Sequence, residues 1–143
     1  MRSNNRVALT ITGLALGLAM SSVRADVVAV VSSKSSLITL SKSQLADIFL
    51  GKTQQFPDGS PAVPIDQEEG ARVRDEFYVV FTGQSPAQVK AHWSKVIFTG
   101  RGKPPRTVSN SEEVRKMITV NPQAISYIER SAVDSTVKVL LQP

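Results

Sequence analysis

Hydrophobic residues in several short stretches occupy continuous or alternating positions, which is the pattern of β-strands. The stretch Asp26–Ser32 (DVVAVVS) consists almost entirely of valine and alanine, as expected for a strand buried on both faces. We expect it to be the first and central strand of a sheet. Near the end of the chain, Val137, Val139 and Leu141 alternate in the manner of a closing strand. The predicted strands cover residues 26–32, 62–65, 107–108, 124–128 and 135–141.

Local start signals mark three helices between these strands. Ser41 and the glutamine three residues later match a capping box, in which the two side chains accept hydrogen bonds from free backbone N–H groups. Ser85 is followed by Pro86, which suits the first helical position because its missing N–H costs nothing there. Asn110 or Ser111 is expected to cap a third helix.

A fourth helix, after Gly70, is predicted by its hydrophobic period. Val73, Phe77, Val80 and Phe81 fall on one stripe that we expect to face the core. Arg74 is then expected to point about a hundred degrees away from Val73. Because helices alternate with strands along the chain, the sequence predicts an α/β fold, a three-layer α/β/α sandwich with a mixed sheet.

The first 25 residues have the features of a secretory signal peptide. Arg2 and Arg6 precede an apolar run over residues 7–20, and we predict cleavage after Ala25. This run is shorter than the roughly 20 residues that cross a bilayer as a helix. We therefore expect export to the periplasm or secretion, with one domain over residues 26–143 and no transmembrane segment in that mature chain.

Composition narrows the function classes. The chain has no cysteine, which excludes disulfides and thiolate chemistry. Without Arg2, Arg6 and Arg24, the 17 basic residues become 14, against 12 acidic residues. This near balance predicts no nucleic-acid partner, and the basic loop at residues 95–106 offers only one aromatic side chain, Phe98, for base stacking.

No group of residues has the pattern of an active site. His92 is the single histidine, and no nucleophile or orienting acid stands at helical spacing from it, so we expect neither an enzyme nor a cofactor. Asp66, Glu68 and Glu69 could be ligands of a hard cation. We favour the interpretation that they are first-turn carboxylates stabilised by the helix that follows, and we expect no metal.

Gly70, Ala71 and Arg72 form a candidate anion site. Backbone N–H groups at a helix start point outward, and an arginine can add a bidentate contact to an oxyanion. Glu68 and Glu69 oppose this function because their charges repel an anion.

A second candidate is the polar turn of Ser33, Lys34, Ser35 and Ser36. It follows the first strand at its carboxyl end, where α/β sheets usually present ligands. The turn is either part of a ligand site or an ordinary surface turn.

The segment Lys95–Arg106 contains four basic residues and no acid, and its glycines and prolines predict an exposed loop. It is either a solvated loop or a surface that docks on an anionic partner.

Three segments carry a resemblance to a known family. Leu40–Lys52 (LSKSQLADIFLGK) resembles a segment of the phosphate-binding substrate-binding proteins of ABC transporters. Ile97–Gly100 (IFTG) is similar to short members of that family, and Asn121–Ile128 (NPQAISYI) resembles its Pro-Gly-Ala-Ile-Gly-Tyr signature. The resemblance implies the fold of one lobe of a periplasmic phosphate-binding protein. It also implies phosphate or another small anion as ligand.

In that family, an Arg-Ser-Asp-Gly-Ser-Gly-Thr turn holds phosphate at a helix start. The resemblance places Asp66 where the arginine would be, and Gly70, Ala71 and Arg72 where the serine, glycine and threonine would be. If an anion binds, we expect contacts from the backbone N–H groups of Gly70 and Ala71, from the Arg72 side chain and from residues 33–36. The alternative is an interaction or sensory module that docks on a membrane transporter, sensor or porin.

Overall fold

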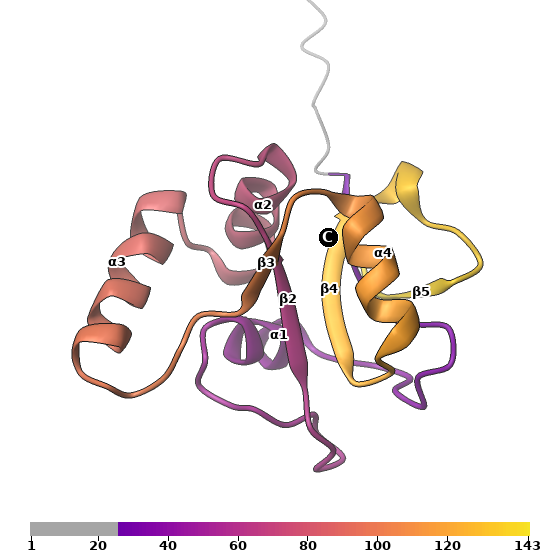
Figure 1. The fold of residues 1–143 in the computed structure, drawn as a ribbon, viewed down its shortest axis with the longest axis horizontal. Coiled ribbons are helices and arrows are strands. Elements are labelled where there is room, and N and C mark those ends of the chain that lie inside the picture. Colours follow the sequence, from indigo (N-terminus) through magenta and orange to yellow (C-terminus); the bar gives the residue numbers. More distant parts are fainter. Residues whose placement is uncertain (1–25) are drawn as a thin grey trace, which may run out of the picture.

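The computed structural model describes residues 26–143, so the predicted signal peptide and its cleavage site lie outside the described residues. Five strands form one mixed sheet: β1 (Val27–Ser32), β2 (Val63–Gln67), β3 (Arg106–Val108), β4 (Ala124–Glu129) and β5 (Val137–Leu141). Their order across the sheet is β3-β2-β4-β1-β5, and Figure 1 labels every strand of the sheet except β1. The middle strand is therefore β4, and the expectation that the first strand is central is wrong. β1 is nevertheless an interior strand, and all six of its residues are buried.

The helices begin at the residues that the capping signals indicate. Ser41 and Ser85 each form a complete capping box, with Pro86 in the first turn of the second helix. Asn110, rather than Ser111, is the N-cap of the helix before β4, and its side chain accepts a hydrogen bond from the Glu113 N–H. The helical elements are α1 (Lys42–Phe49), α2 (Arg72–Phe77), η1 (Tyr78–Thr82), α3 (Pro86–Phe98), α4 (Ser111–Val120) and η2 (Arg130–Ala132).

Two hydrophobic clusters cover the two faces of the sheet. Val27, Ala29 and Val31 of β1 pack in a cluster with buried residues of α1, α2, η1 and α3. Val28 and Val30 point to the other face, where they pack against α4. Alternate residues of one strand thus belong to separate layers. The predicted α/β fold with a mixed sheet between helices is confirmed.

The predicted stripe after Gly70 changes register within the helix. α2 ends at Phe77 and continues as the π-helical turn η1, which holds one residue more per turn than an α-helix. Val73, Phe77 and Phe81 are buried as predicted, and Val80 is half-buried and packs against the same core. Tyr78 is also buried, which the α-helical spacing does not predict; the extra residue in the turn explains this difference.

Strand direction decides which loops can meet. β1 is antiparallel to β4, with Val27 opposite Glu129, whereas β2 is parallel to β4, with Val63 opposite Ala124. The carboxyl end of β2 and the amino end of β1 therefore lie at the same end of the sheet, with β4 between them. The turn after β1 and the turn after β2 lie at opposite ends of the sheet.

Among the residues that the structure describes, no helix is both long enough and apolar enough to cross a membrane.

Candidate functional site

The two predicted groups of ligand-binding residues do not form one site. Ser33, Lys34, Ser35 and Ser36 follow the carboxyl end of β1, at the end of the sheet opposite Gly70, Ala71 and Arg72. Their turn is held by backbone hydrogen bonds within the chain, since the Ser35 N–H donates to the Ser32 carbonyl at 2.9 Å and the Ser33 N–H donates to the carbonyl of the distant Thr136 at 3.0 Å. Ligands of α/β proteins usually bind where the carboxyl ends of parallel strands meet. Because β1 is antiparallel to β4, its carboxyl end and the turn after it lie at the other end of the sheet.

The turn after β2 is exposed and partly occupied by its own bonds. The Ala71 N–H donates to the Glu68 carbonyl at 3.1 Å, and Gly70 has a φ of 92°, which only glycine adopts easily. The side chain of Arg72 is 79% exposed and pairs with Glu76 at 3.1 Å. Of the predicted anion ligands, the Ala71 N–H is thus used inside the turn, and Arg72 contacts a carboxylate.

Asp66 lies just before this turn and is the centre of a buried polar cluster. It is 2% exposed and belongs to β2, so the expectation that it is a first-turn helix carboxylate is wrong. The Tyr78 hydroxyl donates to one carboxylate oxygen at 2.7 Å, and the Tyr127 hydroxyl donates to the other. Arg74 Nε lies 3.4 Å from the oxygen that Tyr78 contacts. We call Asp66, Arg74, Tyr78 and Tyr127 the Asp66 cluster.

Glu68 and Glu69 also precede the helix rather than forming its first turn, because α2 begins at Arg72. Both are exposed, and Glu69 pairs with Lys90 of α3 at 3.1 Å. Their charges lie on the solvent side of the turn. Within residues 26–143, no three histidine or acidic side chains are grouped closely enough to hold a metal ion.

Three elements hold the cluster in place. Arg74 and Tyr78 are four residues apart, so successive helical turns present both side chains to the end of β2. Tyr127 comes from β4, and its ring stacks on Phe77 with centroids 4.0 Å apart. The Gln67 N–H donates to Asp66 Oδ1 at 2.8 Å. Both oxygens of the carboxylate are therefore bonded by donors from the chain.

Burial, followed by the negative charge of Asp66, raises the pKa of both Tyr78 and Tyr127 above the ordinary tyrosine value. Each hydroxyl therefore stays protonated at neutral pH and donates a hydrogen bond to the carboxylate. Burial is the largest single influence on the pKa of Arg74 and lowers it, but the charge of Asp66, the two tyrosines and the hydrogen bond to Asp66 together outweigh burial and raise the pKa. The cluster is thus a carboxylate held by one cation and two neutral donors.

Sequence reasoning missed Arg74, Tyr78 and Tyr127 as partners of Asp66. The spacing of Arg74 and Tyr78 was a usable signal, because residues four apart share a helix face. Tyr127 stands in the segment that resembles the family's tyrosine signature. The segment at residues 121–128 therefore meets residues 66–72, where the resemblance places the family's phosphate-binding turn, through the Asp66–Tyr127 hydrogen bond.

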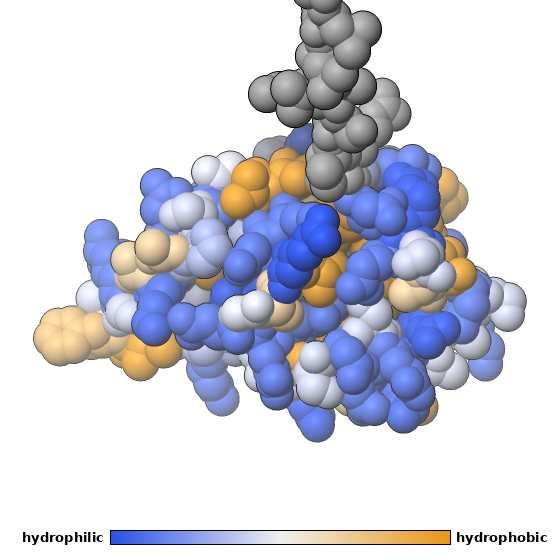
Figure 2. All heavy atoms as spheres, turned by 90° about the horizontal axis from the view of Figure 1, so that it is seen from above, coloured by the Kyte–Doolittle hydropathy of each residue, from blue (hydrophilic) through white to orange (hydrophobic). Residues whose placement is uncertain are grey.

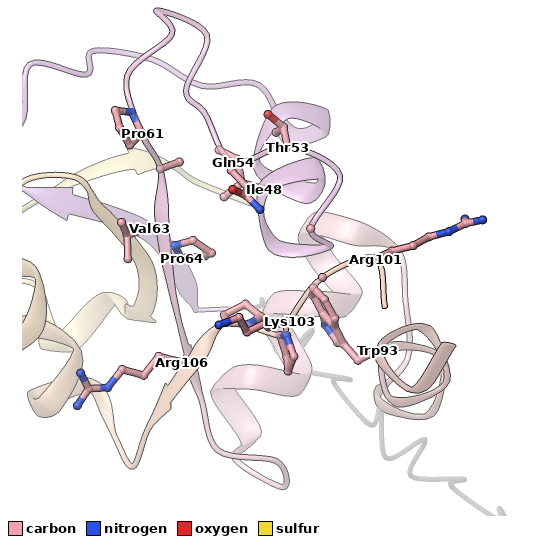
Figure 3. Close-up of a pocket in the computed structure, with 15 residues that line it drawn as sticks. Ile48, Thr53, Gln54, Pro61, Val63, Pro64, Trp93, Arg101, Lys103 and Arg106 are labelled. Atoms are coloured by element: carbon pink, nitrogen blue, oxygen red, sulfur yellow. The ribbon is translucent and has the colours of Figure 1, made fainter. Parts of the chain in front are cut away.

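A separate pocket of about 420 Å³ lies beside the basic loop (Figure 3). Its walls include Pro61, Pro64 and Trp93, and three basic residues of the loop also line it: Arg101, Lys103 and Arg106. In Figure 3, the Arg101 and Arg106 side chains extend in opposite directions. None of these three cations has an ion-pair partner in the described part of the chain. The pocket thus combines an apolar wall with a cationic rim.

His92 is not part of this pocket or of the Asp66 cluster. It is half-buried on α3, and its Nε2 lies 2.8 Å from the Leu50 carbonyl oxygen at the end of α1. This contact joins the two helices.

The sequence matches no protein-family model and no curated protein. Its fold is similar to that of a protein from Clostridium perfringens described as a phosphate ABC transporter substrate-binding protein with bound phosphate. That match has a TM-score of 0.64 at 20% identity and covers 80% of this chain and 44% of the other. An ABC-type phosphate transport receptor from Vibrio cholerae gives 0.63 at 17% identity, covering 80% and 45%. PstS from Borrelia burgdorferi gives 0.60 at 12% identity, covering 80% and 46%.

These matches confirm the predicted resemblance at the level of the fold. This chain spans less than half the length of those structures, as expected for the equivalent of one lobe. At such low identity, the likeness shows the fold alone.

The pKa shifts predict a spectroscopic property of the cluster. The chain has two tyrosines, and both contact Asp66, so the ultraviolet absorbance of tyrosinate reports on the cluster alone. Unfolded tyrosine has a pKa of about 10. Because the folded pKa values are raised, the stabilisation is complete below about pH 10 and is lost as pH rises above it. In a pH titration, tyrosinate should appear only as the chain unfolds, and the free energy of unfolding should fall above about pH 10.

Asp66→Asn provides the comparison for this titration, because it removes the negative charge beside the two tyrosines and leaves both tyrosines buried. Tyrosinate should then appear at a lower pH than in the wild type, whereas the exposed control Glu69→Gln should leave the titration unchanged. Reversible ionisation of either tyrosine near pH 10 in the folded wild type would show that the cluster is open to water.

Proposed function

We propose that this protein is an exported, non-enzymatic, binding-protein-like module that acts by docking on a membrane protein, and that it does not enclose phosphate at the turn after β2. The observation that supports this most is the buried Asp66 carboxylate, whose oxygens already accept hydrogen bonds from Tyr78 and Tyr127. The donors that could have held a ligand anion there bind an acid of the chain itself.

Electrostatics also oppose an anion at this position. Phosphate approaching Asp66 would meet a buried carboxylate, and the exposed Glu68 and Glu69 lie on the solvent side of the same turn. Like charges within a few ångströms repel strongly where water is excluded. Phosphate could replace Asp66 only if that side chain left the cluster and Arg74 lost its counter-charge.

The basic loop supports docking. Its three pocket-lining cations are exposed and free of ion pairs within residues 26–143, so they can meet acidic groups of a partner without first breaking a bond. Beside these cations, the pocket can receive an apolar side chain against the wall formed by Pro61, Pro64 and Trp93. An apolar pocket with a charged rim is the usual arrangement of a specific protein contact.

A second candidate function is weak binding of phosphate or another small oxyanion at Gly70, Ala71 and Arg72. It is favoured by the exposed Arg72 guanidinium at the start of α2 and by the fold likeness to a structure that holds phosphate. Such a site would lie in solvent, and Arg72 would have to exchange Glu76 for the ligand.

Isothermal titration with inorganic phosphate separates the two functions. We expect no saturable heat at millimolar phosphate, because the buried donors are occupied and the turn is exposed. A matched pair of variants, Arg72→Ala and Arg101→Ala, serves as the control. Saturable heat that disappears in Arg72→Ala and persists in Arg101→Ala would establish the second candidate and contradict the first.

Docking itself is tested by cross-linking from a photoreactive amino acid at position 103, with position 116 on α4 as the matched control. Lys103 and Lys116 are both exposed, but α4 covers the opposite face of the sheet from α3. In intact cells, we expect one discrete membrane-protein adduct from position 103 and none from position 116. Equal labelling from both positions would contradict a specific docking surface.

A further inference from the structure

Two large hydrophobic side chains project into solvent at the carboxyl end of α3. Phe98 is 93% exposed and Ile97 is 56% exposed, whereas Val89 and Trp93 of the same helix are buried in the core. Figure 2 shows a hydrophobic protrusion at the end of the molecule where Figure 1 places α3. Removing such side chains from water is favourable in proportion to their apolar area. Two large hydrophobic side chains exposed side by side therefore indicate a surface that binds an apolar partner.

The end of this helix is firmly closed. Gly100 has a φ of 67°, the Gly100 N–H donates to the Ile97 carbonyl at 3.1 Å, and the Arg101 N–H donates to the Val96 carbonyl at 3.1 Å. The Thr99 hydroxyl also donates to the Lys95 carbonyl at 2.8 Å. Phe98 is therefore presented by a capped helix end and not by an irregular loop. We call residues 95–103 the α3 tip.

All charged side chains of the α3 tip are positive. Lys95, Arg101 and Lys103 are exposed, and residues 95–103 contain no acid. Lysine and arginine have long apolar stems, so they can keep their charges in water while the stems lie along an apolar surface. Aromatic and aliphatic side chains ringed by such cations are typical of segments that lie at a membrane interface.

We propose that the α3 tip binds the surface of an anionic lipid bilayer, with Phe98 and Ile97 entering the headgroup region and the three cations beside the lipid phosphates. The convex shape favours lipid over a protein partner, because a protein must offer a matching pocket, whereas a bilayer accepts a protruding side chain anywhere. Charge complementarity selects anionic over zwitterionic lipid. With two apolar side chains, the attachment is weak and reversible.

This inference goes beyond the proposed docking on a membrane protein and does not depend on it. The pocket beside the basic loop shares Arg101 and Lys103 with the α3 tip. Lipid contact at the tip therefore brings the pocket close to the bilayer, where a membrane protein can reach it.

The absence of cysteine from the chain allows a local test. Two variants of the full chain are made, Ile97→Cys and the matched control Ile38→Cys, and an environment-sensitive fluorophore is attached to the single cysteine of each. Ile38 is 87% exposed. Vesicles of phosphatidylcholine with or without phosphatidylglycerol are then added. We expect a blue shift from position 97 with the anionic vesicles, and no shift from position 38. Because the readout is local, membrane contact by residues 1–25 does not produce it.

Lys95→Ala and Arg101→Ala should each weaken the apparent vesicle affinity by about five-fold, the effect of about one surface charge. No shift at position 97 with anionic vesicles would overturn the proposal, as would equal shifts at positions 97 and 38. Equal shifts with zwitterionic and anionic vesicles would overturn the role of the cations. A protein adduct from position 103 without any lipid shift would overturn lipid binding and leave the proposed docking standing.

Discussion

The structure around the turn after β2 depends on the burial of one charged group, the Asp66 carboxylate. Removing a carboxylate from water is costly unless a counter-charge and hydrogen-bond donors compensate it. Arg74 supplies the charge, and Tyr78 and Tyr127 supply donors from η1 and β4. This need for compensation explains why Arg74 and Tyr78, which lie one helical turn apart, both point inward. It also joins β2, α2, η1 and β4 at a single point.

The same constraint separates the fold of this chain from the function of the structures it resembles. The fold matches less than half the length of several phosphate-transport proteins, but identity with them is 20% or lower. A fold can host many functions, and the residues of the site decide among them. Here the buried donors are bound to an acid of the chain, whereas four cations around the pocket and the α3 tip have no ion-pair partner within residues 26–143: Lys95, Arg101, Lys103 and Arg106.

The strands and helix starts could be predicted because their signals are local. The valine run of β1 and the capping residue Ser41 specify their elements within a few positions. The direction of β1 could not be predicted, because antiparallel pairing with β4 joins residues about a hundred positions apart. The burial of Asp66 was missed because carboxylates are rarely buried unless paired, and its partners come from two other segments, the helix that follows it and the distant strand β4. The burial of Tyr78 was missed because α-helical spacing places it outside the stripe of Val73, Phe77, Val80 and Phe81, and the π-helical turn brings it inward.

We propose that the carboxylate of Asp66 fills the polar centre at the end of β2 and leaves no place there for phosphate. A crystal structure of the protein grown in high concentrations of inorganic phosphate tests this directly. We expect electron density for Asp66 within hydrogen-bond distance of both Tyr78 and Tyr127, with no phosphate between them. Phosphate bonded to either tyrosine hydroxyl or to Arg74, with the Asp66 side chain turned away, would contradict it.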